Sequence, residues 1–119
     1  MALKKVFQAG NPVIRQKALI VGKIKSAPIQ TIIRDLTDTM RAQNLVGIAA
    51  PQIGKSLRIF VTEIRKTKLR KNIVPDELRV FINPKIITVS KKTDFGWEGC
   101  GSVAHSGFSQ RYDVQRALQ

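Results

Sequence analysis

The sequence predicts an α+β domain, with one N-terminal helix followed by short, mostly antiparallel strands. Three observations predict this class. Apolar residues recur at helical spacing over residues 28–43, runs rich in β-branched residues follow from residue 56, and prolines and glycines interrupt those runs. The 119 residues are enough for one domain, and no repeat or linker divides them. We therefore expect a single domain over residues 1–119.

The helix is the clearest element of the pattern. Its apolar stripe follows the spacing i, i+3, i+4, i+7, i+11 and consists of Ile29, Ile32, Ile33, Leu36 and Met40. Ser26 is placed to cap the start, and Pro28 suits the first turn because its missing N–H is not needed there. Asn44 is a residue type that adopts the left-handed conformation at a helix end. The stripe predicts that this helix packs on a core.

Short strands are expected over much of the remaining chain. The glycine-rich residues 45–54 are too small for a helix and indicate a turn. The expected strands are residues 56–64, two runs within 77–90 separated by Asn83-Pro84, an extended segment over 95–103, and a weaker strand over 112–118. This order favours antiparallel pairing.

The chain is strongly basic, with 21 Lys and Arg against 8 Asp and Glu and a formal net charge of +13. Such a surface attracts polyanions such as RNA. Residues 65–71 hold five cations and are expected to form a loop, either solvated or in contact with nucleic acid. One cysteine excludes a disulfide within these residues, and they contain no membrane-length apolar run. Because Asn11-Pro12 interrupts the N-terminal segment before an apolar run develops, we expect no secretory leader. We expect a cytoplasmic location, or an organellar matrix, and no membrane partner.

Two short motifs carry the functional signal. Gly47-Ile48-Ala49-Ala50-Pro51-Gln52 places one amide side chain on a rigid run of small residues. Glu98-Gly99-Cys100-Gly101-Ser102 places the only cysteine between two glycines. Together they resemble the motifs G-φ-G-φ-A-A-P-Q and E-G-C-L-S of the peptide deformylase family, and the resemblance covers about residues 5 to 104 in the right order.

The resemblance implies a specific chemistry. Deformylases are metallohydrolases that remove the formyl group from the N-terminal formyl-methionine of nascent polypeptides, with iron or zinc as the divalent metal. It makes Cys100 a metal ligand, and Gln52 with the backbone N–H of Gly101 the groups that stabilise the oxyanion. It also implies a substrate pocket, formed by Gly47, Ile48, Trp97 and Glu98.

The sequence departs from the family at its third motif. The family's other two ligands and its general base come from an H-E-x-x-H helix, whereas these residues contain one histidine, His105, and no glutamate after Glu98. One thiolate does not hold a catalytic metal. We therefore expect a truncated, C-terminally incomplete member that neither retains the metal nor acts alone. Apolar faces over residues 57–61 and 80–89 should be exposed, which favours self-association.

Two alternatives remain open at this stage. The chain could be a non-catalytic basic module that binds RNA or the ribosome, with a vestigial pocket. Cys100 could also act as a nucleophile with His105 as its base, but five residues of extended chain place the two side chains on opposite faces. Two positions depart from the motifs. Leu45 stands where the first motif has its first glycine, and we expect its side chain to crowd a pocket edge. Gly101 stands where the second motif has leucine.

Overall fold

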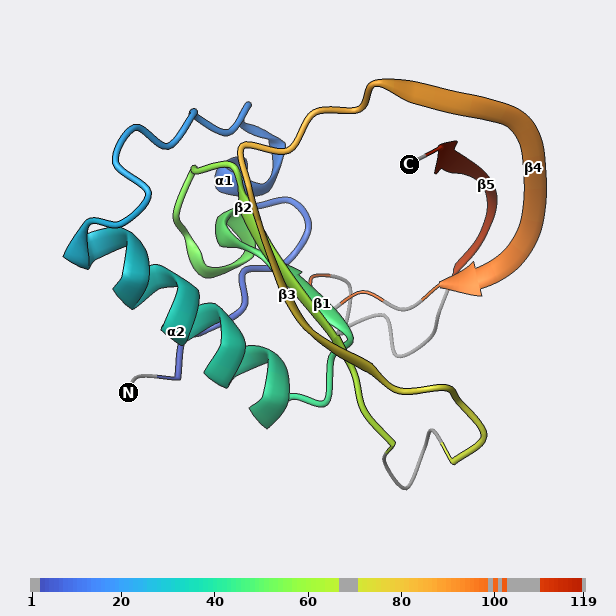
Figure 1. Ribbon diagram of the computed structural model, residues 1–119, viewed down its shortest axis with the longest axis horizontal. Helices are drawn as coiled ribbons and strands as arrows, with labels where there is room; N and C mark the ends of the chain where they lie inside the picture. The colour runs from blue at the N-terminus through green and yellow to red at the C-terminus, as the bar shows by residue number, and fades with distance from the viewer. Residues whose placement is uncertain (1–2, 67–70, 99, 101, 103–109, 119) are drawn as a thin grey trace.

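The structure is a computed structural model that describes residues 3–66, 71–98, 100, 102 and 110–118. Its elements are two helices, a short 3₁₀ helix and five strands. In chain order they are α1 (Pro12–Arg15), α2 (Ala27–Ala42), β1 (Gly47–Ala49), η1 (Ala50–Ile53), β2 (Ile59–Ile64), β3 (Asp76–Ile82), β4 (Thr88–Glu98) and β5 (Gln110–Leu118). The α+β prediction is confirmed (Figure 1).

Helix α2 lies within one residue of the predicted bounds. Pro28 stands in its first turn, and Asn44 follows its end in the left-handed region, with φ 55°. The predicted cap is wrong in one respect: Ser26 occupies the N-cap position, but its side chain makes no capping hydrogen bond. Helix α1 was not predicted. Its signal was Asn11-Pro12, where Asn11 Oδ1 accepts a hydrogen bond from the N–H of Val13.

Strands β1, β2 and β3 form an antiparallel sheet in that order, and α2 covers one of its faces (Figure 1). Burial alternates along β2, because successive side chains point to opposite faces. Ile59 and Val61 are buried in the core. On the other face Phe60 stacks on its cross-strand neighbour Phe81, with ring centroids 4.5 Å apart.

The core lies between α2 and this sheet. Its largest fully buried apolar side chains are Leu36, Met40, Ile59 and Val61. Of the predicted helix stripe, Ile29, Ile32, Leu36 and Met40 are buried, and Ile33 packs against them half-buried. Leu45 also packs against this cluster, and its N–H donates to Met40 O at 2.9 Å. The side chain that was expected to crowd a pocket edge is therefore used for core packing.

Strands β4 and β5 form a second, two-stranded antiparallel sheet. Figure 1 shows it curving away from α2 and the three-stranded sheet. The predicted break at Asn83-Pro84 is confirmed, since β3 ends at Ile82 and β4 begins at Thr88. Strand β4 is longer than predicted and includes the first part of the segment expected over residues 95–103. The last strand begins two residues before the predicted 112–118.

The predicted exposure of apolar faces is partly wrong. Over residues 57–61, Ile59 and Val61 are buried beneath α2, because the helix already covers that face of the sheet. Over residues 80–89 the expectation holds. Val80 and Val89 are about two-fifths exposed, Ile86 is 73% exposed, and Ile87 is 90% exposed. The exposed apolar surface thus follows the segment from β3 into β4.

Candidate functional site

Gln52 is the residue around which the candidate site is organised. It stands on η1 directly after β1, so its backbone is tied to the edge of the three-stranded sheet. Its Oε1 accepts a hydrogen bond from the N–H of Ala49 at 3.0 Å. Its Nε2 donates to Ser102 Oγ at 3.1 Å. The carboxamide is therefore held at both ends.

The second motif lies against the first. Nε2 of Gln52 is 3.9 Å from Cys100 Sγ, a weak donor–sulfur contact across 48 residues of sequence. The Cys100 thiol is free and exposed, whereas Ser102 is buried, with 5% of its surface exposed. The structure thus brings the Gln52 amide and the Cys100 thiol together, as the family resemblance implied. It also places the buried hydroxyl of Ser102, the last residue of the second motif, against the same amide.

An N-terminal segment over residues 7–9, here called the strap, joins the two motifs through the backbone. The N–H of Phe7 donates to Gln52 O at 2.7 Å, and the N–H of Ala9 donates to Ser102 O at 2.6 Å. Phe7 also covers Gly54, the left-handed residue that ends η1 with φ 85°. A Cβ at Gly54 would overlap the Phe7 ring, so glycine is required there by both the backbone and the packing.

Sequence reasoning did not find the roles of Phe7, Ala9 and Ser102. Main-chain hydrogen bonds from Phe7 and Ala9 leave no trace in side-chain identity. Ser102 did carry a signal, because it is the last residue of the second motif, but only the fold brings its hydroxyl to Gln52. The strap and the hydroxyl together set the spacing between the motifs.

The other predicted site residues lie as follows. Ile48 is 2% exposed and belongs to the core cluster. Gly47 pairs with Thr62, and a Cβ on it would make ordinary contacts with β2, at 3.4 Å from Val61 O. Trp97 and Glu98 lie on β4, in register with β5. Gly101 and His105 lie outside the described residues. The pocket roles of these residues stay predictions.

The metal that the resemblance implies needs three protein ligands close together. Among the residues the structure describes, no group of three His, Cys, Asp or Glu side chains is placed to hold a metal ion. Cys100 contributes one sulfur, and a catalytic zinc-type site needs three protein ligands and an open position. The described residues therefore do not fit a complete metal site.

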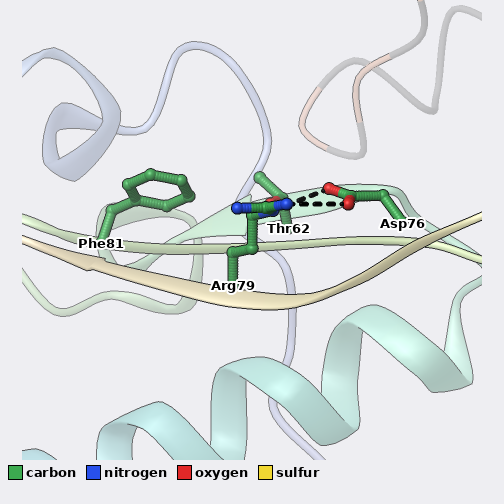
Figure 2. A pocket seen from close by; sticks show the side chains of 4 residues that line it. All are labelled: Thr62, Asp76, Arg79 and Phe81. Carbon is green, nitrogen blue, oxygen red and sulfur yellow. Dashed lines mark hydrogen bonds and ion pairs between the residues drawn. The ribbon is translucent and has the colours of Figure 1, made fainter. Parts of the chain in front are cut away.

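A hollow of about 690 Å³ lies on the face of the sheet opposite α2 (Figure 2). It is lined by Thr62, Asp76, Arg79 and Phe81. Arg79 Nε and Nη2 donate to the two Asp76 carboxylate oxygens at 2.9 and 3.1 Å. This hydrogen-bonded pair lowers the pKa of Asp76 and raises that of Arg79. The two charges satisfy each other, and the hollow is not lined by Gly47, Ile48, Gln52 or Cys100, the predicted site residues whose side chains the structure describes.

Of the basic loop predicted over residues 65–71, residues 67–70 lie outside the described chain, so RNA contact there stays a prediction. Among the helices that the structure describes, none combines the length and apolar character of a membrane span.

A carboxamide held at both ends beside an exposed thiol, on a small α+β scaffold, is the arrangement that the two sequence motifs predicted. Comparison with known proteins specifies the family. A family model described as polypeptide deformylase matches residues 3–119. The chain belongs to the peptide deformylase family.

Individual relatives support this membership. The chain is 43% identical over 98 residues to peptide deformylase 2 of Nostoc sp. (82% of this chain, 55% of the relative), and 43% identical over 101 residues to the Pseudothermotoga lettingae peptide deformylase (85% and 52%). A Met-Ala-Ser-bound class I type b peptide deformylase from Acinetobacter baumannii matches with a TM-score of 0.83 at 28% identity, covering 98% of this chain and 72% of that one. The chain spans about half the length of the curated relatives it matches. These matches support the prediction of the deformylase family, and they give no support to the alternative of a non-catalytic RNA-binding module.

Proposed function

We propose that the chain takes part in removing the formyl group from the N-terminal formyl-methionine of nascent polypeptides. One observation carries the proposal: the Gln52 carboxamide is fixed with its Nε2 3.9 Å from Cys100 Sγ, so an amide donor and an exposed thiol lie side by side. The related Acinetobacter baumannii enzyme is described as bound to Met-Ala-Ser, a peptide that begins with methionine. Both facts fit a site for a methionyl peptide.

In this proposal Gln52 acts on the formyl carbonyl oxygen. Nε2 carries two N–H donors: one is used on Ser102, and the other makes only the weak contact of 3.9 Å with Cys100 Sγ, which a substrate oxygen would replace. Hydrolysis converts the planar carbonyl into a tetrahedral species whose oxygen carries negative charge. A donor that is already oriented stabilises that charge without reorganising in the transition state. The N–H of Gly101 is its proposed partner.

Cys100 is the proposed metal ligand contributed by these residues. Deformylases are metalloenzymes, and the metal, when bound, supplies an activated water. The 119 residues contain one histidine and one cysteine, so the imidazole pair and the general base of the family are not among them. We propose that these residues alone neither retain the ion, iron or zinc, nor hydrolyse substrate. We derive no metal-bound step from them.

The proposal predicts a gain of activity by complementation. The chain alone should release no formate from formyl-Met-Ala-Ser. A fusion that continues the chain with the C-terminal segment of the Nostoc deformylase should bind about one metal ion per chain and release formate, because the ligand set is then complete. Formate release and metal content are the two measurements.

Two variants of the fusion make the test specific. Gln52→Ala should lower kcat by about 100-fold, the usual effect of losing one oxyanion donor. Gln30→Ala, on the exposed surface of α2, is the matched control and should leave kcat unchanged. Formate release by the metal-loaded 119-residue chain would contradict the donor argument. A fully active Gln52→Ala fusion would contradict the role of the amide.

Self-association is a second expected behaviour of the isolated chain. Ile86 and Ile87 are largely exposed, and Val80 is partly exposed on β3, which is an edge strand of its sheet. Light scattering should show dimers or larger species. Replacing Ile86 and Ile87 together by lysine should shift the distribution to monomers, whereas Lys85→Ala should not. A monomer across a wide range of concentrations would contradict this expectation.

The remaining partner and location remain proposals. A net charge of +13 favours contact with the RNA of the ribosome, from which nascent chains emerge. Such binding should weaken steeply as the salt concentration rises. A nascent-peptide substrate also fits the cytoplasm or an organellar matrix.

A further inference from the structure

We infer that Ser102 is a positioning residue, whose hydroxyl sets the direction in which the Gln52 carboxamide presents its second N–H. The inference rests on the proposed function and deepens it. Its basis is the hydrogen bond of 3.1 Å from Gln52 Nε2 to Ser102 Oγ, between a half-buried amide and a hydroxyl in a residue that is 5% exposed.

The amide needs this restraint because of its own chemistry. The last torsion of a glutamine side chain is broad and nearly two-fold, so an unrestrained carboxamide samples many tilts and both flips. The N–H of Ala49, which donates to Oε1, excludes the flipped orientation, because the NH₂ group would then face another donor. Ala49 thus decides which end of the amide faces the thiol.

Ser102 decides the tilt. One Nε2–H is committed to the hydroxyl, so the direction of the other is determined by the planar geometry of the amide. That second N–H faces Cys100 Sγ, with 3.9 Å between nitrogen and sulfur, and a carbonyl oxygen bound on the Cys100 side would replace this weak contact. The hydroxyl itself does not contact the reacting atoms. It acts through Gln52.

The strap makes Ser102 a fixed reference point. Ala9 holds the Ser102 carbonyl at 2.6 Å, and Phe7 holds the Gln52 carbonyl at 2.7 Å, both through main-chain N–H groups. Three residues before the strap, the N–H of Lys4 donates to Thr39 Oγ1 at 3.0 Å and ties the chain to α2. A hydroxyl whose backbone is held in this way restrains the amide more strongly than one on a free loop.

The first test reads the amide directly and needs neither metal nor substrate. In the ¹⁵N-labelled chain, the side-chain NH₂ of Gln52 should exchange with water more slowly than the NH₂ of Gln43, an exposed residue just after α2. Ser102→Ala should accelerate the Gln52 exchange by about fivefold, because a lost hydrogen bond of about 1 kcal/mol corresponds to that factor. Ser102→Thr, which keeps the hydroxyl, should restore slow exchange. Ser26→Ala is the matched control, since Ser26 makes no capping hydrogen bond.

The second test uses the fusion described above. Ser102→Ala should lower kcat by about tenfold with KM changed by less than about twofold, because a misdirected donor weakens transition-state binding more than substrate binding. Ser102→Thr should recover most of kcat. If Ser102→Ala and Ser102→Thr lowered kcat equally and neither changed the exchange rate of the Gln52 side-chain NH₂, the inference would be overturned. Ser102 would then contribute only packing. An inactive fusion would refute the proposed function, while the exchange experiment would still decide the role of Ser102.

Discussion

Replacing Asn83 with alanine is expected to lower the free energy of unfolding by about 3 kcal/mol. Asn83 follows β3, and its side chain forms two hydrogen bonds with the backbone of Val21, 62 residues away. Oδ1 accepts from the Val21 N–H at 2.8 Å, and Nδ2 donates to Val21 O at 2.9 Å. Val21 is only 4% exposed, so both of its backbone groups would be left unsatisfied in a buried place.

The backbone of Asn83 adds to this effect. Its φ of 53° lies in the left-handed region, where asparagine is tolerated and alanine costs about 1 kcal/mol or more. Urea unfolding of three variants separates the terms. Asn83→Gly removes both hydrogen bonds but keeps the backbone relaxed, so it should be less destabilising than Asn83→Ala. Asn83→Asp keeps the acceptor and loses the donor. Equal stability of wild type and Asn83→Ala would show that the clamp contributes nothing.

Replacing Glu63 with glutamine is expected to destabilise the chain by about 2 kcal/mol at neutral pH. Glu63 is buried on β2, and its carboxylate accepts from Arg41 Nε at 2.9 Å and Nη2 at 2.8 Å, with Arg65 Nε at 3.2 Å. These contacts join the end of α2 to the sheet. Hydrogen bonds between charged groups contribute about 1.5–3 kcal/mol each, but both guanidinium groups are two-fifths exposed and partly screened.

The pH dependence of this effect has a definite sign. The hydrogen bonds from Arg41 lower the pKa of Glu63 below its ordinary value of 4.5. Folding therefore favours the ionised carboxylate, and the stabilisation is present above pH 4.5 and is lost as the pH falls through the lower pKa of the folded state. The difference in unfolding free energy between wild type and Glu63→Gln should shrink below about pH 4.5.

A matched control exists in the exposed pair of Asp76 and Arg79. Asp76→Asn should change stability little at any of these pH values, because an exposed ion pair is screened by solvent. Denaturant midpoints from pH 3 to pH 7 measure both variants. If the Glu63→Gln difference grew in acid, the assigned sign of the linkage would be wrong.

The two halves of the fold were not equally predictable. The helix was found to within one residue because its apolar stripe and flanking Pro28 and Asn44 are local signals. The break at Asn83-Pro84 was local in the same sense. Helix α1 was missed because four residues show no periodicity. The extent of β4 was missed because residues 91–94, which are polar and mostly charged, lie between the two segments predicted as strands.

By itself the sequence determined the α+β class, the amphipathic helix, the two motifs and the shortage of imidazole donors, because each depends on residue type and near-neighbour spacing. Only the tertiary structure decided that Gln52 is clamped between Ala49 and Ser102, that the strap joins the two motifs, and that Asn83 holds Val21. These contacts depend on chain closure over as many as 62 residues and on main-chain groups that every residue carries. A donor common to all residues has no signature in the sequence, so its partner is known only once the chain has folded.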